Sequence, residues 1–313
     1  MTKVVLGIDI GGTNTVFGLI DNTGTIHYSE QIPTHGDQPP TDIVDRLSEK
    51  VHSILNNKME FELTGIGVGA PNGNHFTGMI QDPPNLSWGN LDINSLLAET
   101  FSCHVKLTND ANAAAMGEKR FGIAKEMNDF VVITLGTGLG SGIFSGGKIM
   151  YGHDGMAGEM GHLSLDPEGR KCTCGLRGCL EMYASANGMR KTVQEFQNAN
   201  PDDEFLSSLD NGNIDGRVID RAVDEGIESA KALYEYTGDK LAMGLSLAAT
   251  ILSPEAFIFY GGYSQAGDRL LNPARKALDS YLMENLKGKV KILQSGLPHG
   301  QAGILGAASL IWT

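Results

Sequence analysis

Three of the chain's four cysteines fall within eight positions, and they are Cys172, Cys174 and Cys179. Cysteine sulfurs are soft ligands, and a structural zinc site takes four ligands in a tetrahedron. The histidines near the cluster are His162 and His153. Buried thiols, a disulfide and a redox pair are the alternatives, but a Cys-x-Cys pair suits a disulfide poorly, and the glycines and basic residues around it argue against an apolar core. The spacing therefore predicts a Cys3His zinc site, with His162 preferred over His153.

Two glycine-rich turns could bind phosphate. The first is Asp9-Ile10-Gly11-Gly12-Thr13, and the second is Leu135-Gly136-Thr137-Gly138-Leu139-Gly140. Backbone N–H groups in such turns bind phosphate. The aspartate can reach the metal ion that accompanies the phosphate, directly or through water. Either turn alone could be a plain hairpin turn, but one in each half of the chain favours a nucleoside triphosphate. Neither is a P-loop, because no Gly-Lys-Ser/Thr follows, and neither leads into a helix as a dinucleotide site would.

Asp110 lies where a predicted strand ends and an alanine-rich helix begins, in Asn109-Asp110-Ala111-Asn112. Ordinary capping is one interpretation, because Asn and Asp are favoured N-cap residues. The other is a catalytic base. A helix N-terminus keeps the carboxylate ionised and weakly basic. Phosphoryl transfer tolerates a weak base, because the hydroxyl proton becomes acidic late and orientation matters more than basicity.

The elements that must position these residues follow one plan twice. Residues 3–21 and 129–149 each read as a β-hairpin with a tight glycine turn, and their separation suits a duplicated domain. The other predicted elements are helices at 41–57, 92–101, from 109, within 180–250, at 267–285 and at 302–312, and strands at 63–71, 104–108 and 256–262. This pattern predicts a mixed α/β protein with two similar halves.

Composition limits the function classes. The chain has 313 residues, which favours two lobes, and its formal net charge of −13 argues against a nucleic-acid surface. We also expect no membrane association, because no apolar run approaches the roughly 20 residues that a span needs. With no secretory signal and no disulfide framework, a cytoplasmic protein is expected.

The motifs together resemble the ROK family of sugar kinases (repressor, open reading frame, kinase), most closely its bacterial glucokinases. The resemblance runs over almost the whole chain, and a Glu–His motif coupled to a cysteine cluster is its most specific part. The matching segments are DIGGT at 9–13, PPNL at 83–86, NDANAA at 109–114, LGTGLGSG at 135–142, GEMGH at 158–162, CTCGLRGCLE at 172–181 and GG at 261–262.

The resemblance implies an actin-like ATPase (ribonuclease H-like) duplicated α/β fold, with two lobes around a central cleft. The small lobe would comprise residues 1–109, completed by the C-terminal helix 300–313. The large lobe, residues 110–299, would carry the zinc loop and the adenosine side of the ATP site. The implied activity is ATP-dependent phosphorylation of a hexose, glucose first, at its 6-hydroxyl, with Mg2+ and a structural Zn2+ as cofactors. A homodimer is expected by resemblance alone.

The resemblance also assigns residues to this activity. Asp110 would be the catalytic base, and His162 would place one ring nitrogen on zinc and the other toward the sugar. The residues implied to bind the sugar are Asn85, Asn109, Asp110, Glu159, His162 and Glu181. The residues expected on the Mg-ATP side are Asp9, Gly11, Gly12, Thr13, Gly136, Thr137, Gly138, Gly261 and Gly262.

Two departures from the family pattern bear on specificity. The usual Gly-x-Pro-Gly reads Gly69-Ala70-Pro71-Asn72 here, and the later glycine run reads YGGY, where a third glycine or a small residue is more usual. Other hexoses remain alternatives, namely fructose, mannose, allose, N-acetylglucosamine and N-acetylmannosamine. A sugar-responsive repressor is a remote alternative, because the first glycine turn begins at residue 9 and leaves no room before it for a DNA-binding domain.

Overall fold

The computed structural model of the chain describes residues 1–57, 60–84, 86–210, 214–298 and 300–312. They form two compact units. The first contains Met1–Met127, Ile149–Ala157 and Gly296–Thr313, and the second contains Asn128–Lys148 and Gly158–Ser295. The first unit therefore extends beyond the boundary expected at residue 109. It includes helix α3 (Asp110–Phe121), because α3 packs against the C-terminal helix α10 (Ala302–Ser309).

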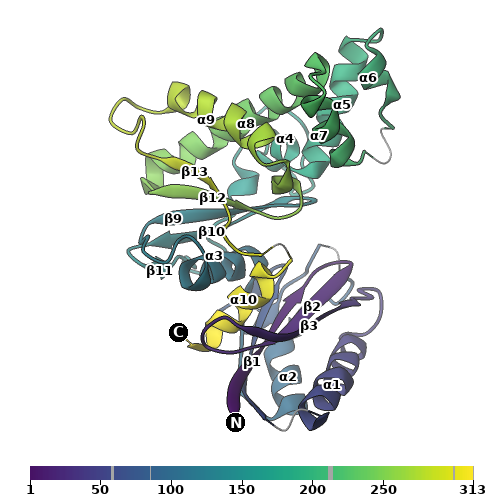
Figure 1. Cartoon of the computed structure of the whole chain (residues 1–313), viewed down its shortest axis with the longest axis vertical. Coiled ribbons are helices and arrows are strands. Elements are labelled where there is room, and N and C mark those ends of the chain that lie inside the picture. The colour runs from purple at the N-terminus through teal and green to yellow at the C-terminus, as the bar shows by residue number, and fades with distance from the viewer. Residues whose placement is uncertain (58–59, 85, 211–213, 299, 313) are drawn as a thin grey trace. The chain divides into compact units, whose positions relative to one another are not determined.

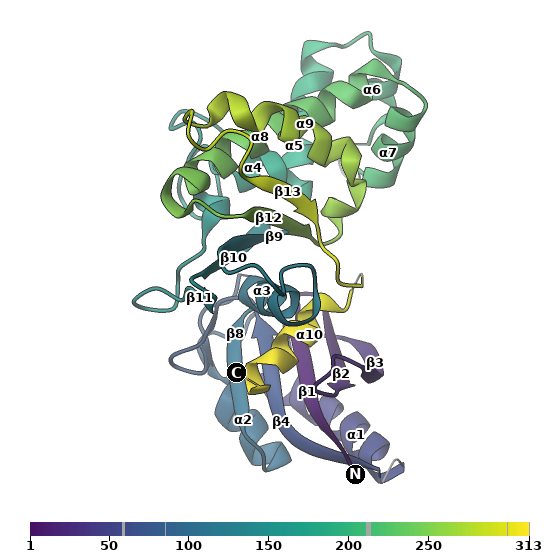
Figure 2. The ribbon, with the colours of Figure 1, turned by 60° about the vertical axis from the view of Figure 1, so that its left-hand side comes forward.

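The first unit is built on a five-stranded sheet with the order β3-β2-β1-β4-β8, which can be followed in Figure 2. Its strands are β1 (Thr2–Ile10), β2 (Asn14–Ile20), β3 (Ile26–Pro33), β4 (Phe61–Ala70) and β8 (Val105–Asn109). Its other elements are α1 (Pro40–Asn57), α2 (Ile93–Phe101), η3 (Leu310–Trp312) and a small sheet of β5 (Gly73–Asn74), β6 (Met79–Ile80) and β7 (Leu91–Asp92). β1 and β2 are antiparallel, as the sequence predicted, whereas β1, β4 and β8 are parallel.

The two faces of β1 pack differently. Val4, Leu6 and Ile8 point toward α1 and α2 and form one buried core with them. This alternation follows from the two-residue period of a strand. The opposite face of the sheet carries α10, drawn in yellow beside the purple strands in Figure 1. At Gly67 of β4 a Cβ atom would lie 1.8 Å from the Ala307 carbonyl oxygen, so glycine is required for the helix to approach this closely.

The second unit repeats the plan of the first. Its sheet has the order β11-β10-β9-β12-β13, with β9 and β10 antiparallel and β9 parallel to β12. The strands are β9 (Phe130–Leu135), β10 (Leu139–Ser145), β11 (Lys148–Ile149), β12 (Ala256–Tyr260) and β13 (Lys291–Gln294). The helices are α4 (Glu181–Ala184), α5 (Ala186–Ala199), α6 (Glu204–Ser208), α7 (Gly216–Asp224), α8 (Glu228–Leu252) and α9 (Asp268–Tyr281), with short turns η1 (Met160–His162) and η2 (Tyr263–Ala266). The predicted duplication is thereby confirmed.

In the described part of the chain, no helix has both the length and the apolar character that crossing a membrane requires.

Candidate functional site

Asp110 is the first residue of α3, directly after β8 ends. The preceding Asn109 is the N-cap, and its Oδ1 accepts a hydrogen bond of 2.9 Å from the backbone N–H of Ala111. The Asp110 Oδ1 atom also accepts from this N–H, at 2.8 Å. Because Asn109 is the residue that caps the helix, the exposed Asp110 carboxylate need not serve as the cap and can meet a ligand.

Asp9 lies near the carboxyl end of β1, beside the first glycine turn. The turn is closed by the Gly11 N–H, which donates to the Asn14 carbonyl at 3.0 Å. A Cβ atom at Gly69 of β4 would lie 3.7 Å from Cα of Asp110 and 3.9 Å from Oδ1 of Asp9. Because β4 runs between β1 and β8 in the sheet, its end brings both carboxylates to one edge. The first unit therefore presents two acidic groups beside a glycine turn.

These carboxylates affect each other's environment. Burial, and then the charge of Asp110, raise the pKa of Asp9 from 3.8 to about 7. The Asp110 side chain is open to solvent, but the protein atoms around it still desolvate its charged form and raise its pKa, although the Ala111 and Asp110 N–H groups and the Asn109 side chain oppose this shift. The helix start therefore does not make this carboxylate the weak base that the sequence indicated. Without a cation nearby, two ionised carboxylates at Asp9 and Asp110 repel each other, so the doubly ionised state is unfavourable. The pair is therefore suited to a bound divalent ion.

We expect Asp9→Asn to remove a pH dependence of stability. Between about pH 4 and 7 the folded state keeps the Asp9 proton while the unfolded state loses it, so the free energy of unfolding of the wild type falls as pH rises. The melting temperature of the ligand-free protein, measured across this window, should fall less steeply in Asp9→Asn. The control Asp92→Asn alters another aspartate of the same unit, and curves of equal slope for all three proteins would contradict the assignment.

Gly303 leaves room for the Asp9 side chain, and its local sequence does not mark it as a site residue. A Cβ atom at this position would lie 2.1 Å from the Asp9 Oδ2 atom, so only glycine leaves room for the carboxylate beside α10. The available signal was a glycine inside an apolar helical segment, AGILG at 302–306. Glycine weakens a helix interior and so calls for a packing reason.

The second glycine turn lies at the carboxyl end of β9 and is held by hydrogen bonds to residues 181–187. The backbone N–H of Leu139 donates to Oε2 of Glu181 at 2.9 Å. At the start of α5, the Ala186 N–H donates to the Gly136 carbonyl at 3.0 Å, and the Asn187 N–H donates to that of Thr137 at 3.4 Å. These bonds connect the turn to the segment that follows the cysteines.

Gly261 and Gly262 lie beside this turn, because β12 is the parallel neighbour of β9. Gly261 has a φ of 104°, and a Cβ atom there would lie 2.4 Å from the Leu135 carbonyl oxygen. The second unit thus brings its two candidate nucleotide segments together. Tyr263, in the YGGY departure, has a buried hydroxyl, and burial raises its pKa.

The cysteine cluster and His162 come together in the second unit. One ligand atom from each of His162, Cys172, Cys174 and Cys179 lies within 4.8 Å of all the others. The Cys172 Sγ–His162 Nδ1 distance is 3.7 Å, and the Cys174 Sγ–Cys179 Sγ distance is 3.6 Å. All four cysteines of the chain are free thiols, so these three form no disulfide. His153 belongs to the first unit, outside this group.

Glu159 directly precedes η1, the turn that contains His162. The His162 Nε2 atom lies 4.0 Å from Oε2 of Glu159, so the ring nitrogen that does not face the cysteines faces this carboxylate. Ser141 of β10 fixes the turn, since its hydroxyl donates to the Gly158 carbonyl and accepts from the Met160 N–H at 3.4 Å. Asn85, the remaining predicted sugar contact, lies outside the described residues.

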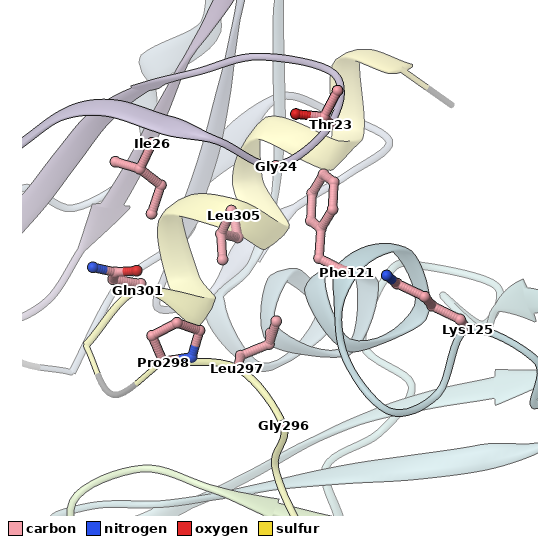
Figure 3. Close-up of a pocket in the computed structure, with 10 residues that line it drawn as sticks. All are labelled: Thr23, Gly24, Ile26, Phe121, Lys125, Gly296, Leu297, Pro298, Gln301 and Leu305. Carbon is pink, nitrogen blue, oxygen red and sulfur yellow. The ribbon is translucent and has the colours of Figure 1, made fainter.

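A separate pocket of about 430 Å³ lies in the first unit, and none of the predicted site residues that the structure describes lines it (Figure 3). Phe121, Leu297 and Leu305 give it an apolar lining, and Lys125 supplies a charged group. This mixed lining does not define a ligand chemistry, and the acidic and cysteine-containing groups above remain the stronger candidates.

The comparisons with known proteins agree with the geometry. Two units on the same hairpin-and-parallel-strand plan, each with a glycine turn after its first strand, define an actin-like ATPase fold. The model of the ROK family matches residues 5–313, and the chain belongs to that family.

Its relatives include enzymes and regulators. The chain is 34% identical over 313 residues to a glucokinase from Streptomyces coelicolor, with 98% of this chain and 97% of the relative covered. A ROK family glucokinase from Streptomyces griseus, solved in complex with glucose and AMPPNP, is 32% identical and has a TM-score of 0.83, with 98% of each chain covered. A xylose repressor from Bacillus subtilis is 30% identical, but the match covers 98% of this chain and only 76% of the repressor.

Proposed function

We propose that this protein is an ATP-dependent hexose kinase that phosphorylates the 6-hydroxyl of glucose. The observation that carries the proposal is the exposed Asp110 carboxylate at the start of α3, beside Asp9 and the first glycine turn. A base for an alcohol nucleophile must be accessible and held in a fixed direction, and a helix start provides both. The glucokinase relatives, one of them solved with glucose and an ATP analogue, support the same activity.

In the proposed reaction Asp110 accepts the proton of the sugar hydroxyl. The hydroxyl oxygen forms a bond to the γ-phosphorus of ATP while the bond from that phosphorus to the β–γ bridging oxygen breaks, and ADP leaves with the electron pair. The hydroxyl proton is released late in this displacement, so a positioned carboxylate suffices. Asn109 keeps Asp110 in place by capping the helix.

Asp9 is the proposed partner of Mg2+. The raised pKa values of the two carboxylates mean that their ionised forms lack a compensating positive charge, which supports a divalent cation as their partner. Carboxylate oxygens are hard donors of the kind that Mg2+ takes. When bound, Mg2+ would neutralise phosphate charge. The backbone N–H groups of Gly11, Gly12 and Thr13 are the proposed phosphate donors of the first turn, and those of Gly136, Thr137 and Gly138 are the proposed donors of the second. Gly261 and Gly262 are assigned to the adenosine.

Sugar recognition is assigned to polar side chains that can pair with sugar hydroxyls. They are Asn85, Asn109, Asp110, Glu159, His162 and Glu181. Carboxylates and amides suit this task, because a buried polar group left unpaired by the wrong sugar costs binding energy. His162 fits two contacts, since its Nδ1 faces the cysteines and its Nε2 is left for Glu159 and a ligand.

The cysteine group fits zinc. A tetrahedral site with Zn–S bonds of about 2.3 Å has S···S edges of about 3.8 Å. The Cys174–Cys179 separation of 3.6 Å is close to this value. We assign His162, Cys172, Cys174 and Cys179 as the ligands of a structural Zn2+ that holds His162 and Glu181 in place.

A hexose panel tests the proposal. We expect ATP-dependent ADP release with glucose, and a kcat/KM for glucose above that for mannose, fructose, allose, N-acetylglucosamine and N-acetylmannosamine. A higher kcat/KM for another sugar would change the proposed substrate but leave the kinase assignment intact. The absence of turnover with every sugar, in protein that contains zinc and melts cooperatively, would overturn the kinase assignment.

A further inference from the structure

Asn72, directly after the Gly69-Ala70-Pro71 stretch, adopts an uncommon backbone conformation. Its φ of 52° lies in the left-handed region, which glycine adopts freely and asparagine tolerates better than most residues. Glycine would therefore adopt this backbone conformation at least as easily. The conformation alone does not explain why the residue is asparagine.

The Asn72 side chain joins two segments. Its Nδ2 atom donates to the carbonyl oxygens of Gln81, at 3.0 Å, and Asp82, at 3.1 Å. In return, the backbone N–H of Gln81 donates to the Asn72 carbonyl at 3.1 Å. A carboxamide has two N–H donors on a short side chain, which glycine, serine and aspartate do not offer. Asparagine is thus the residue that combines this backbone with this pair of bonds.

The two joined segments lead to different parts of the proposed hexose site. Asn72 follows β4, whose last residue, Ala70, pairs with Asn109 on β8. A Cβ atom at Gly73 would lie 2.5 Å from the Thr108 carbonyl oxygen, so the turn packs directly on the strand that leads to Asp110. On the other side, residues 81–82 precede the PPNL segment at 83–86.

Asn74 adds a second connection to the same point. This side chain is buried, and its Nδ2 donates to Oε1 of Gln81 at 3.2 Å and to the Asp154 carbonyl at 2.7 Å. Gln81 is therefore held through its carbonyl, its N–H and its side chain. Of these bonds, the ones from the Asn72 carboxamide can be removed without altering a buried residue, because Asn72 is only partly buried.

We propose that Asn72 is a positioning residue for the hexose: its carboxamide fixes residues 81–82 against the end of β4 and so holds the start of the PPNL segment. This inference rests on the proposed function and deepens it. Asn72 replaces the glycine of the family pattern with a residue that keeps the turn and adds a connection.

Asn72→Gly tests this inference, because it keeps the left-handed backbone and removes both side-chain bonds. We expect faster amide hydrogen exchange at Gln81 in the ligand-free full-length protein. The KM for the hexose should rise about tenfold, as expected for two lost hydrogen bonds, while the KM for ATP stays within about twofold of the wild type. Asn72→Asp has the same shape without the donors, and should show at least the same change.

The matched control is Ser102→Gly, which places glycine at another left-handed position of the same unit, the C-cap of α2. Its exchange at Gln81 and its KM for the hexose should equal those of the wild type. Unchanged exchange in Asn72→Gly would overturn the connection, and faster exchange with an unchanged hexose KM would overturn the positioning role. Failure of the proposed function would be distinct, since the wild type itself would then turn over no hexose.

Discussion

Asp110→Asn is expected to lower the kcat for hexose phosphorylation about a thousandfold, the scale on which a positioned base contributes. The amide has the shape of the carboxylate but cannot take the hydroxyl proton. The Asn109 cap does not depend on the charge of Asp110, so the KM values for hexose and ATP should change little. Steady-state turnover, measured by ADP release with both substrates saturating, checks this prediction.

The stability of the same variant separates loss of the base from loss of the fold. The pKa of Asp110 is raised, so the folded state disfavours its ionised form, and the neutral amide removes that cost. The melting temperature of ligand-free Asp110→Asn should therefore equal or exceed that of the wild type above neutral pH. Asp92→Asn makes the same change at another helix N-terminus and should keep full turnover. An Asp110→Asn variant that retained most of the wild-type kcat would show that Asp110 is not the base.

The fold could be predicted well from the sequence because its repeating unit is local. A strand, a glycine turn and a second strand lie within about 20 residues, and the pairings of β1 with β2 and of β9 with β10 confirm both hairpins. The spacing of Cys172, Cys174 and Cys179 carries the metal prediction in the same way, because all three lie within eight consecutive residues, and in the structure their sulfur atoms lie close together. Patterns that are complete within a short segment can be read without knowing the tertiary structure.

Contacts between distant segments could not be predicted in this way. Gly303 shows its function only once α10 lies against β1, close to 300 residues earlier in the chain. The carboxamide of Asn72 meets residues 81–82 only because a left-handed turn directs it there. The bond from Leu139 to Glu181 joins positions 42 apart, and nothing in either local sequence indicates it. Such contacts depend on how the elements pack.

The bond between Leu139 and Glu181 changes what loss of the metal should do. From the sequence alone, zinc loss is expected to damage sugar binding before ATP binding, because His162 and Glu181 flank the cysteines. In the structure, Glu181 also holds the second glycine turn, and it lies two residues after Cys179. If the segment 172–181 changed conformation after loss of zinc, Glu181 would no longer hold the second glycine turn. The proposed phosphate donors at Gly136 and Gly138 would then also become less ordered.

Cys174→Ala is accordingly expected to lose about one equivalent of zinc per chain and to raise both KM values, by about tenfold or more for the hexose and less for ATP. Cys174 is the exposed member of the group, so its truncation removes a ligand with little loss of packing. Cys103→Ala, a change at the cysteine outside the group, should keep the metal and both KM values. Metal analysis and two-substrate kinetics on the three proteins check this. A native wild type free of zinc would refute the site, whereas a raised hexose KM with an unchanged ATP KM would show that Glu181 does not couple the zinc loop to the phosphate turn.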